Sequence, residues 1–319
     1  MGFWAPWAYE EFVEAHAGLE KVELLRQGPG EPFDTDYPDI RVGYDTMPVW
    51  MELSNLITLD IGDKRFARQN ETHFRLLRQA YQADMDRYKV DVKSRLNQIK
   101  ARRTGLALLA EINATRRQLR IQPFHGEGIN AWVEVRMLGS VYGTAEGKRI
   151  NYLDPEDRRV GKGGGADSPI KFTPGLFTGS MMVAPSFAPD EVLFHEMVHA
   201  SREMRGVLDR VPVDRGYDDQ EEYLAVILTN IYLSEKGQTV FRGDHRLGKI
   251  YSNEEDILLS NPQHVSMSPV TLLENFKSSQ PDFYRALAHL PTPPRHNLVR
   301  QYDMRRDYYL QKQRGAFIL

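Results

Sequence analysis

Residues 189–205 read PDEVLFHEMVHASREMR, and this stretch decides how the rest of the chain is interpreted. Pro189 is tolerated in the first turn of a helix, and Asp190 and Glu191 suit the positive end of the helix dipole. Gly206 follows as a typical C-terminal stop. The pattern therefore predicts one helix over residues 189–205.

Inside this helix runs the HExxH arrangement HEMVH, in which His195 and His199 lie four residues apart. Side chains at that spacing leave one face of a helix, so the two imidazoles can hold one metal ion. Glu196 lies about 100° round the helix, where its carboxylate can take a proton from activated water. Apolar neighbours indicate a buried helix, in which unpaired histidines would be costly. We therefore expect a zinc site with Glu196 as its catalytic base.

A catalytic zinc needs a third protein ligand, and the helix itself does not supply one. Arg202 stands where the glycine of the extended HExxHxxGxxH pattern would be. Downstream, residues 218–233 read DDQEEYLAVILTNIYL, a second helix with an acidic start and an apolar body. Its first turn offers both Glu221 and Glu222 as the third ligand.

Several further polar residues near these helices are candidates for supporting roles. Tyr217 is the first candidate for a donor to the oxyanion that forms during peptide hydrolysis, and His245 and His296 are weaker ones. Asp218 or Asp219 could orient a ligand histidine.

The remaining periodicities predict an α+β fold with a small mixed sheet behind the two helices. Residues 1–60 read as an irregular leader with a short helix over 10–25, and the sheet is expected to begin at residue 118. A glycine-rich surface loop is expected over residues 161–165, without the spacing of a phosphate-binding loop. We expect an amphipathic helix or a helix pair over 64–99, a helix over 104–113, and strands over 118–122, 131–137, 151–153, 170–172 and 179–184. This divides the chain into a mainly helical N-terminal region, 1–100, and a metallopeptidase domain, 101–319.

Composition excludes several classes of function. The chain has no cysteine, so a thiol nucleophile and Cys-ligated metal are excluded. A net charge of -3 and a pI near 6.3 argue against a nucleic-acid partner. The apolar runs are much shorter than the roughly 20 residues of a membrane span. The N-terminus has no pattern of a cleavable signal peptide.

Three segments resemble one known family. They are GLALL at 105–109, FHEMVHA at 194–200 and EEYLAVILTNIY at 221–232. Together they resemble the NleD-like bacterial effector zinc metallopeptidases. The EYLA run at 222–225 also resembles the ligand segment of HExxH-plus-Glu (gluzincin-like) peptidases, which favours Glu222 over Glu221 as third ligand.

The resemblance implies a zincin-like endopeptidase that hydrolyses proteins inside a target cell. Such a protein would be made in the bacterial cytoplasm, secreted without a cleavable signal peptide and accompanied by a secretion chaperone or an immunity protein. We expect the substrate to lie along residues 181–184. Two alternatives stay open: a toxin of an interbacterial system, and a catalytically silent zincin-like binding or scaffold protein.

Overall fold

The computed structural model describes residues 30–43, 83–124, 131–133, 164–177, 187–209, 219–244, 250–251, 269–291 and 295–316. Within these ranges the fold is α+β, as predicted. Its strands are β1 (Glu31–Asp34), β2 (Tyr37–Val42), β3 (Leu119–Gln122), β4 (Trp132–Val133), β5 (Ser168–Lys171), β6 (Phe241–Arg242) and β7 (Ile250–Tyr251). Its helices are 83–100, α4 (Arg103–Ala114), the 3-10 turn η3 (Pro174–Phe177), α5 (Pro189–Arg205), α6 (Gln220–Glu235), α8 (Pro269–Ser279), α9 (Pro281–Ala288), α10 (Leu298–Met304) and α11 (Arg306–Ala316).

A five-stranded mixed sheet of order β1-β2-β3-β5-β4 forms one side of the fold. Strands β2, β3 and β5 are parallel, while β1 and β4 are antiparallel edge strands. The hairpin β1–β2 lies in residues that the sequence analysis read as an irregular leader. That reading is wrong for residues 31–42, and so is the expectation that the sheet begins at residue 118. The division of the chain at residue 100 stays a prediction.

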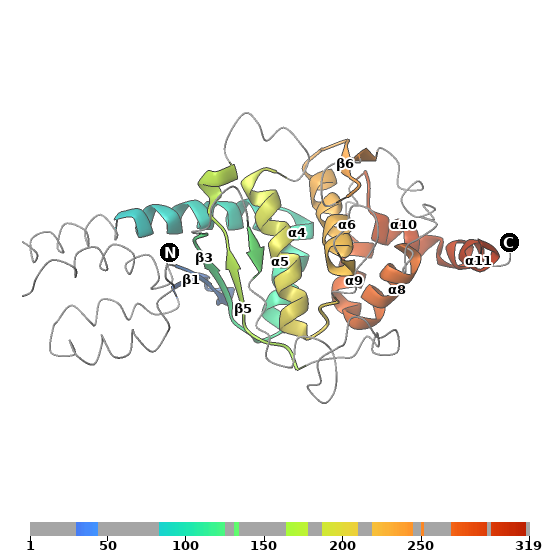
Figure 1. The fold of residues 1–319 in the computed structure, drawn as a ribbon, viewed down its shortest axis with the longest axis horizontal. Coiled ribbons are helices and arrows are strands. Elements are labelled where there is room, and N and C mark those ends of the chain that lie inside the picture. Colours follow the sequence, from blue (N-terminus) through green and yellow to red (C-terminus); the bar gives the residue numbers. More distant parts are fainter. Residues whose placement is uncertain are drawn as a thin grey trace, which may run out of the picture.

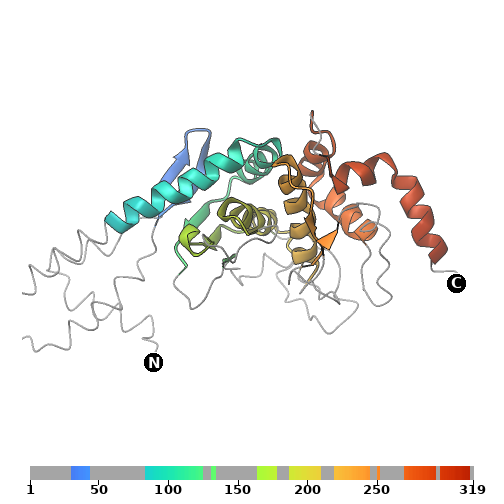
Figure 2. The same ribbon diagram turned by 90° about the horizontal axis from the view of Figure 1, so that it is seen from above.

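Helix α5 stands between the sheet and the other helices. Figure 1 shows β3 and β5 on one side of α5 and α6 on the other, and α5 packs against both β5 and α6. Helix α4 packs against β2, α5 and α6, and the C-terminal helices α8–α11 lie beyond α6 (Figures 1 and 2). The HExxH segment of α5 is therefore enclosed by secondary structure on opposite sides.

The long helix 83–100 has the periodicity that the sequence predicted. Met85, Tyr88, Val92, Leu96 and Ile99 recur at three- and four-residue steps, and all are buried. The chain then turns sharply into α4, and Gly105 permits the turn because a Cβ there would lie 1.9 Å from the Ile99 carbonyl oxygen. The predicted residues 64–82 of this helix, and the predicted helix 10–25, lie outside the described residues.

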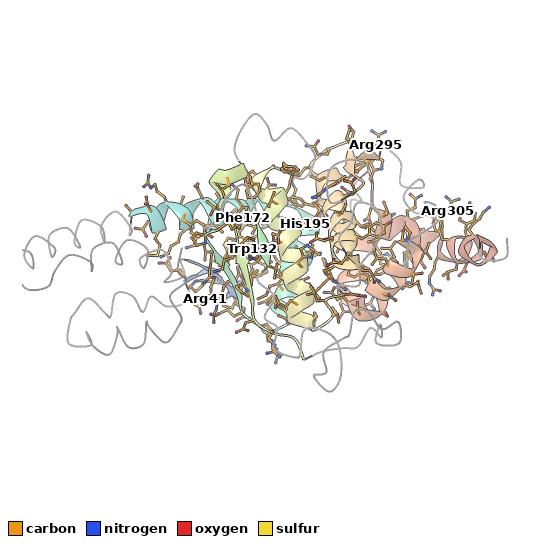
Figure 3. The ribbon with its side chains drawn as sticks, in the orientation of Figure 1. Arg41, Trp132, Phe172, His195, Arg295 and Arg305 are labelled. Carbon is orange, nitrogen blue, oxygen red and sulfur yellow. The ribbon has the colours of Figure 1, made fainter. Side chains whose placement is uncertain are left out.

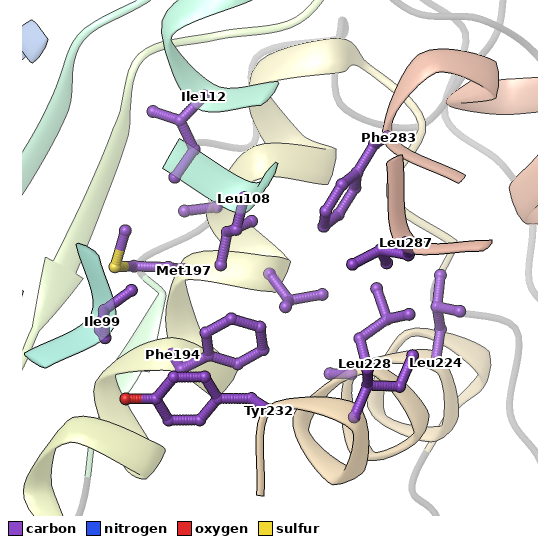
Figure 4. Packing of buried hydrophobic residues seen from close by; sticks show 14 of the residues in the cluster. Ile99, Leu108, Ile112, Phe194, Met197, Leu224, Leu228, Tyr232, Phe283 and Leu287 are labelled. Atoms are coloured by element: carbon purple, nitrogen blue, oxygen red, sulfur yellow. The ribbon is translucent and has the colours of Figure 1, made fainter. Parts of the chain in front are cut away.

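The core is one continuous cluster that runs from β2 to α11. Figure 4 shows its centre, where side chains of α4, α5, α6 and α9 meet. The rings of Phe194 and Tyr232 stack at 4.5 Å with planes 7° apart, which joins α5 directly to α6. The described helices include none long and apolar enough to cross a membrane.

Two predicted strands and one predicted loop are only partly described. Strand 131–137 is seen as β4 over its first residues, and strands 151–153 and 179–184 lie outside the described residues. In the predicted surface loop, Gly164 is exposed but Gly165 is buried. Gly165 has φ +70°, and a Cβ there would lie 2.0 Å from the Met204 carbonyl oxygen, so the loop touches the last turn of α5.

Candidate metal centre

Helix α5 has the bounds that its sequence predicted, because its ends are set locally. Pro189 occupies the first turn, and the Glu191 carboxylate accepts a hydrogen bond of 3.3 Å from the Ala188 N–H. At the other end, Gly206 is left-handed with φ 69°. These local signals fix where the HExxH residues fall on the helix.

Helix α6 runs antiparallel to α5, and charged contacts join the helices at both ends. Lys236, just after α6, lies 2.7 Å from Asp190 and 2.6 Å from Glu191 at the start of α5. Arg202, near the end of α5, lies 2.6 Å from Glu221 at the start of α6. The first turn of α6 is thereby held beside the middle of α5.

Three side chains of these helices converge. The His195 Nε2 lies 3.1 Å from the Glu222 Oε2 and 3.1 Å from the His199 Nε2, and the latter lies 3.3 Å from the same carboxylate oxygen. Figure 3 places His195 between α5 and α6. Both histidines are buried, whereas the Glu222 side chain is 19% exposed. The cluster therefore meets solvent on its Glu222 side.

Burial and the close carboxylates alter the pKa of each member. Burial lowers the pKa of His195 to about 4, although the hydrogen bond with Glu222 opposes this. Burial would also lower the pKa of His199, but the charges of Glu222 and Glu221 raise it well above its usual value. The pKa of Glu222 is held far below its ordinary range by His199 and His195, against the effect of burial. The Glu222 carboxylate is thus anionic and needs a positive partner, either a protonated histidine or a metal ion.

The donor set fits a zinc ion. Two imidazole nitrogens and one carboxylate oxygen are a common protein ligand set for catalytic zinc. Zinc ligands at about 2.0–2.2 Å from the ion stand about 3.3–3.6 Å apart in a tetrahedron. The three observed separations, 3.1, 3.1 and 3.3 Å, are close to that spacing. Among the described residues these three side chains are the group that could hold a metal ion.

Comparison with known proteins identifies the family to which this chain belongs. The protein-family model Peptidase M91, described as an effector protein, matches residues 78–283, which is more than half of the chain. The chain belongs to the Peptidase M91 family. No curated protein and no solved structure matches it. The matched range includes both site helices of this M91 chain, and family membership makes it a peptidase-type effector protein.

Glu196, the acidic residue of the HExxH motif, lies close to the cluster. It is buried on α5, and its charge contributes to the raised pKa of His199. The Glu196 carboxylate is therefore buried within electrostatic reach of His199.

Glu221, the competing candidate ligand, occupies a different place. It is 1% exposed, accepts hydrogen bonds from Arg202 Nε at 2.8 Å and from the Asp209 N–H at 3.0 Å, and its Oε1 lies 3.7 Å from the His199 Nδ1. It therefore contacts the outer nitrogen of His199 rather than the nitrogens that face Glu222. Although burial would raise its pKa, the charge of Arg202 holds it below its usual value.

The residues expected to stabilise the oxyanion or to orient a ligand histidine lie in several places. Asp219 caps α6 by accepting a hydrogen bond of 2.9 Å from the Glu222 N–H, so it does not orient a histidine through that contact. His296 lies against Phe241, with ring centroids 4.3 Å apart, and is not part of the cluster. Tyr217, Asp218, His245 and the expected substrate strand 181–184 lie outside the described residues.

Sequence reasoning missed two residues next to the cluster. Thr229, on α6, lies with its Oγ1 3.4 Å from the His195 Nδ1. Arg202 was noted for the glycine that it replaces and not for its buried pair with Glu221. The signal for Arg202 was a cation on a helix with an apolar face, whereas no local pattern distinguishes Thr229.

Proposed function

We propose that the chain is a zinc-dependent endopeptidase of the NleD-like, gluzincin type, which hydrolyses peptide bonds in proteins of a target cell. The observation that carries the proposal is the convergence of His195, His199 and Glu222 at 3.1–3.3 Å inside a chain of a peptidase family. Two imidazole nitrogens and an anionic oxygen at this spacing are satisfied by a divalent cation, and the residue types favour zinc.

Each residue of the site then has a chemical role. His195, His199 and Glu222 hold the ion, which when bound supplies the Lewis acidity that makes water nucleophilic at neutral pH. Glu196 takes a proton from the attacking water and delivers it to the amine of the broken peptide bond. Tyr217 stays our predicted donor to the oxyanion.

Membership of an effector family supports delivery into a host cell. We therefore propose that the protein is made in the bacterial cytoplasm and delivered without a cleavable signal peptide. A secretion chaperone or an immunity protein stays a proposed partner. The exposed edge of the cluster at Glu222 is consistent with access for a protein substrate.

Metal content and cleavage, measured side by side, test the proposal. The full chain and its Glu222→Ala and Glu196→Gln variants would be loaded with zinc, desalted and analysed for metal. Each would then be incubated with a proteome-derived peptide library whose new termini are read by mass spectrometry. We expect about one zinc per wild-type chain.

The two variants separate metal binding from proton transfer. Glu222→Ala should lose zinc and cleavage together. Glu196→Gln should keep zinc and lose about 100- to 10,000-fold of the cleavage rate. A folded wild type that retains no zinc, or a Glu196→Gln variant that cleaves at the wild-type rate, would overturn the proposal.

A further inference from the structure

Each histidine of the cluster has a second ring nitrogen, and these outer nitrogens have different neighbours. The His195 Nδ1 lies 3.4 Å from the hydroxyl oxygen of Thr229. The His199 Nδ1 lies 3.7 Å from the Oε1 of Glu221. Since the inner Nε2 atoms point toward Glu222, whatever fixes the hydrogen on Nδ1 also decides whether Nε2 has a free electron pair.

The Thr229 hydroxyl can only accept from His195. Its single hydrogen is donated to the Ala225 carbonyl oxygen at 2.7 Å, within the same helix. A hydroxyl whose hydrogen is already used offers only lone pairs to a further neighbour. The contact therefore requires the hydrogen of neutral His195 to sit on Nδ1, which leaves the Nε2 lone pair free toward the cluster.

Glu221 imposes the same arrangement on His199. Its carboxylate is an acceptor because it already receives Arg202 Nε and the Asp209 N–H, both through Oε2. The Glu221 Oε1 and the His199 Nδ1 are both buried and lack a hydrogen-bond partner, although the Oε1 also lies 2.6 Å from the Arg202 Nε in the ion pair. A potential donor, the His199 Nδ1, and a potential acceptor, the Glu221 Oε1, thus face each other at 3.7 Å. A small rotation of the His199 ring would bring them within hydrogen-bond distance.

We infer that Glu221 and Thr229 are positioning residues that keep the hydrogens of His199 and His195 on Nδ1 and direct both Nε2 lone pairs at one metal ion. This inference rests on the proposed metal centre. Carboxylates and other acceptors behind ligand histidines fix the ring and raise its basicity, and losing one typically weakens metal binding. Glu221 is therefore a residue behind the ligands and not the third ligand itself.

Arg202 holds Glu221 in this place and extends the arrangement to the C-terminal helices. Its remaining nitrogens donate to the Gln280 side chain at 3.0 Å and to the Val207 carbonyl oxygen at 2.7 Å. Gln280, the residue before α9, donates in turn to the Glu111 carboxylate of α4 at 2.9 Å. The orientation of His199 is thereby tied to four helices.

Zinc affinity of the full chain, measured by competition with a chromophoric chelator, tests the inference without any substrate. The variants are Glu221→Gln, Thr229→Val and a matched control, Glu203→Gln. Glu203 is an equally buried carboxylate of the same helix as the histidines, but it accepts a hydrogen bond of 2.6 Å from Ser168 on the sheet side.

We expect Glu221→Gln to weaken zinc binding about 10- to 100-fold, Thr229→Val to weaken it less, and the control to stay within about threefold of wild type. Equal affinities of Glu221→Gln and Glu203→Gln would overturn the inference. The proposed function fails separately, through a Glu222→Ala variant that still binds zinc as the wild type does.

A second measurement does not depend on a variant that folds. Nitrogen-15 NMR of the zinc-loaded wild-type chain reports which ring nitrogen of each histidine carries hydrogen. We expect both His195 and His199 to carry it on Nδ1, with slow exchange of that hydrogen with water because the site is buried. A hydrogen on Nε2 of His199, or binding of zinc through its Nδ1, would overturn the inference.

Discussion

The two ends of α5 are both joined to α6 by charge, yet they differ in what the charges touch. At the first turn, Asp190 and Glu191 meet Lys236 and the hydroxyl of Tyr232, and the lysine remains partly exposed. At the last turns, the Arg202 pair with Glu221 is buried and adjoins His199. Ion pairs thus join the same two helices at both ends, but only the Arg202 pair adjoins the candidate metal site.

The first-turn contact, which we call the helix-end clamp, joins Lys236 to Asp190 and Glu191. Acidic groups at the start of α5 and a cation at the end of α6 both suit the helix dipoles, and the Lys236 side chain keeps 20% of its surface exposed to water. The Arg202 contact is different, because two buried charges depend on each other for solvation. We therefore expect stability to depend on both ends but zinc affinity to depend only on the second.

The largest expected effect comes from Arg202→Met. This change leaves the buried Glu221 carboxylate without its cation, which should cost about 3–5 kcal/mol of unfolding free energy. Zinc affinity should fall as well, since Glu221 can then move away from His199. Denaturant unfolding of the metal-free chain and chelator competition measure the two quantities. A variant that loses stability but binds zinc normally would break the distinction between the two ends.

Lys236→Met tests the clamp end and should have an intermediate effect. Charge-assisted hydrogen bonds to Asp190 and Glu191 are lost; both carboxylates are buried, but water can replace the ammonium at the partly exposed lysine position. We expect a loss of about 1–2 kcal/mol in the same denaturant experiment. Zinc affinity should equal that of the wild type, and a tenfold loss would show that this end also sets the site.

Tyr232→Phe removes less of the clamp. The phenol donates a hydrogen bond of 2.7 Å to Asp190, while its ring stacks on Phe194. Because phenylalanine keeps the stack, the loss should be about 1 kcal/mol. Thermal unfolding measures it, with Tyr232→Leu as the comparison that removes the stack too. If both variants lost the same stability, the hydroxyl and not the ring would join the helices.

An ion pair far from α5 should give the smallest effect. Arg306 of α11 contacts Glu274 of α8, and its hydrogen bond holds the pKa of Glu274 below its usual value. Glu274 therefore adds stability above its unfolded pKa, and this contribution is lost as pH falls through the lower folded pKa. Glu274→Gln should cost about 0–1 kcal/mol at pH 7, with no cost in strong acid and no effect on zinc. Unfolding curves at several pH values check the sign.

The parts of the site that follow from local spacing were predictable. Helix α5 is bounded by Pro189 and Gly206, and the four-residue step places His195 and His199 on one face. Glu221 and Glu222 were not separable from spacing alone, since both lie in the first turn of α6. Only the rotation of α6 against α5 directs Glu222 to the cluster and Glu221 to Arg202.

The parts that depend on distant pairing were not predictable. Strand β2 contains Pro38 and Asp39, which are poor strand formers, and it is stabilised by parallel pairing with β3 from far along the chain. Thr229 looks like any small polar residue of a buried helix until its Oγ1 is seen beside His195. Such roles exist only in the folded arrangement.

The proposed ligands come from two helices, with His195 and Glu222 separated by 27 positions along the chain. If the proposed delivery takes the chain through a narrow secretion channel in extended form, these groups are far apart in transit and offer no preorganised site. The ion would then be acquired at the destination, after α5 and α6 have paired again. The zinc supply of the receiving compartment, rather than that of the producing cell, would decide how much of the delivered protein becomes active.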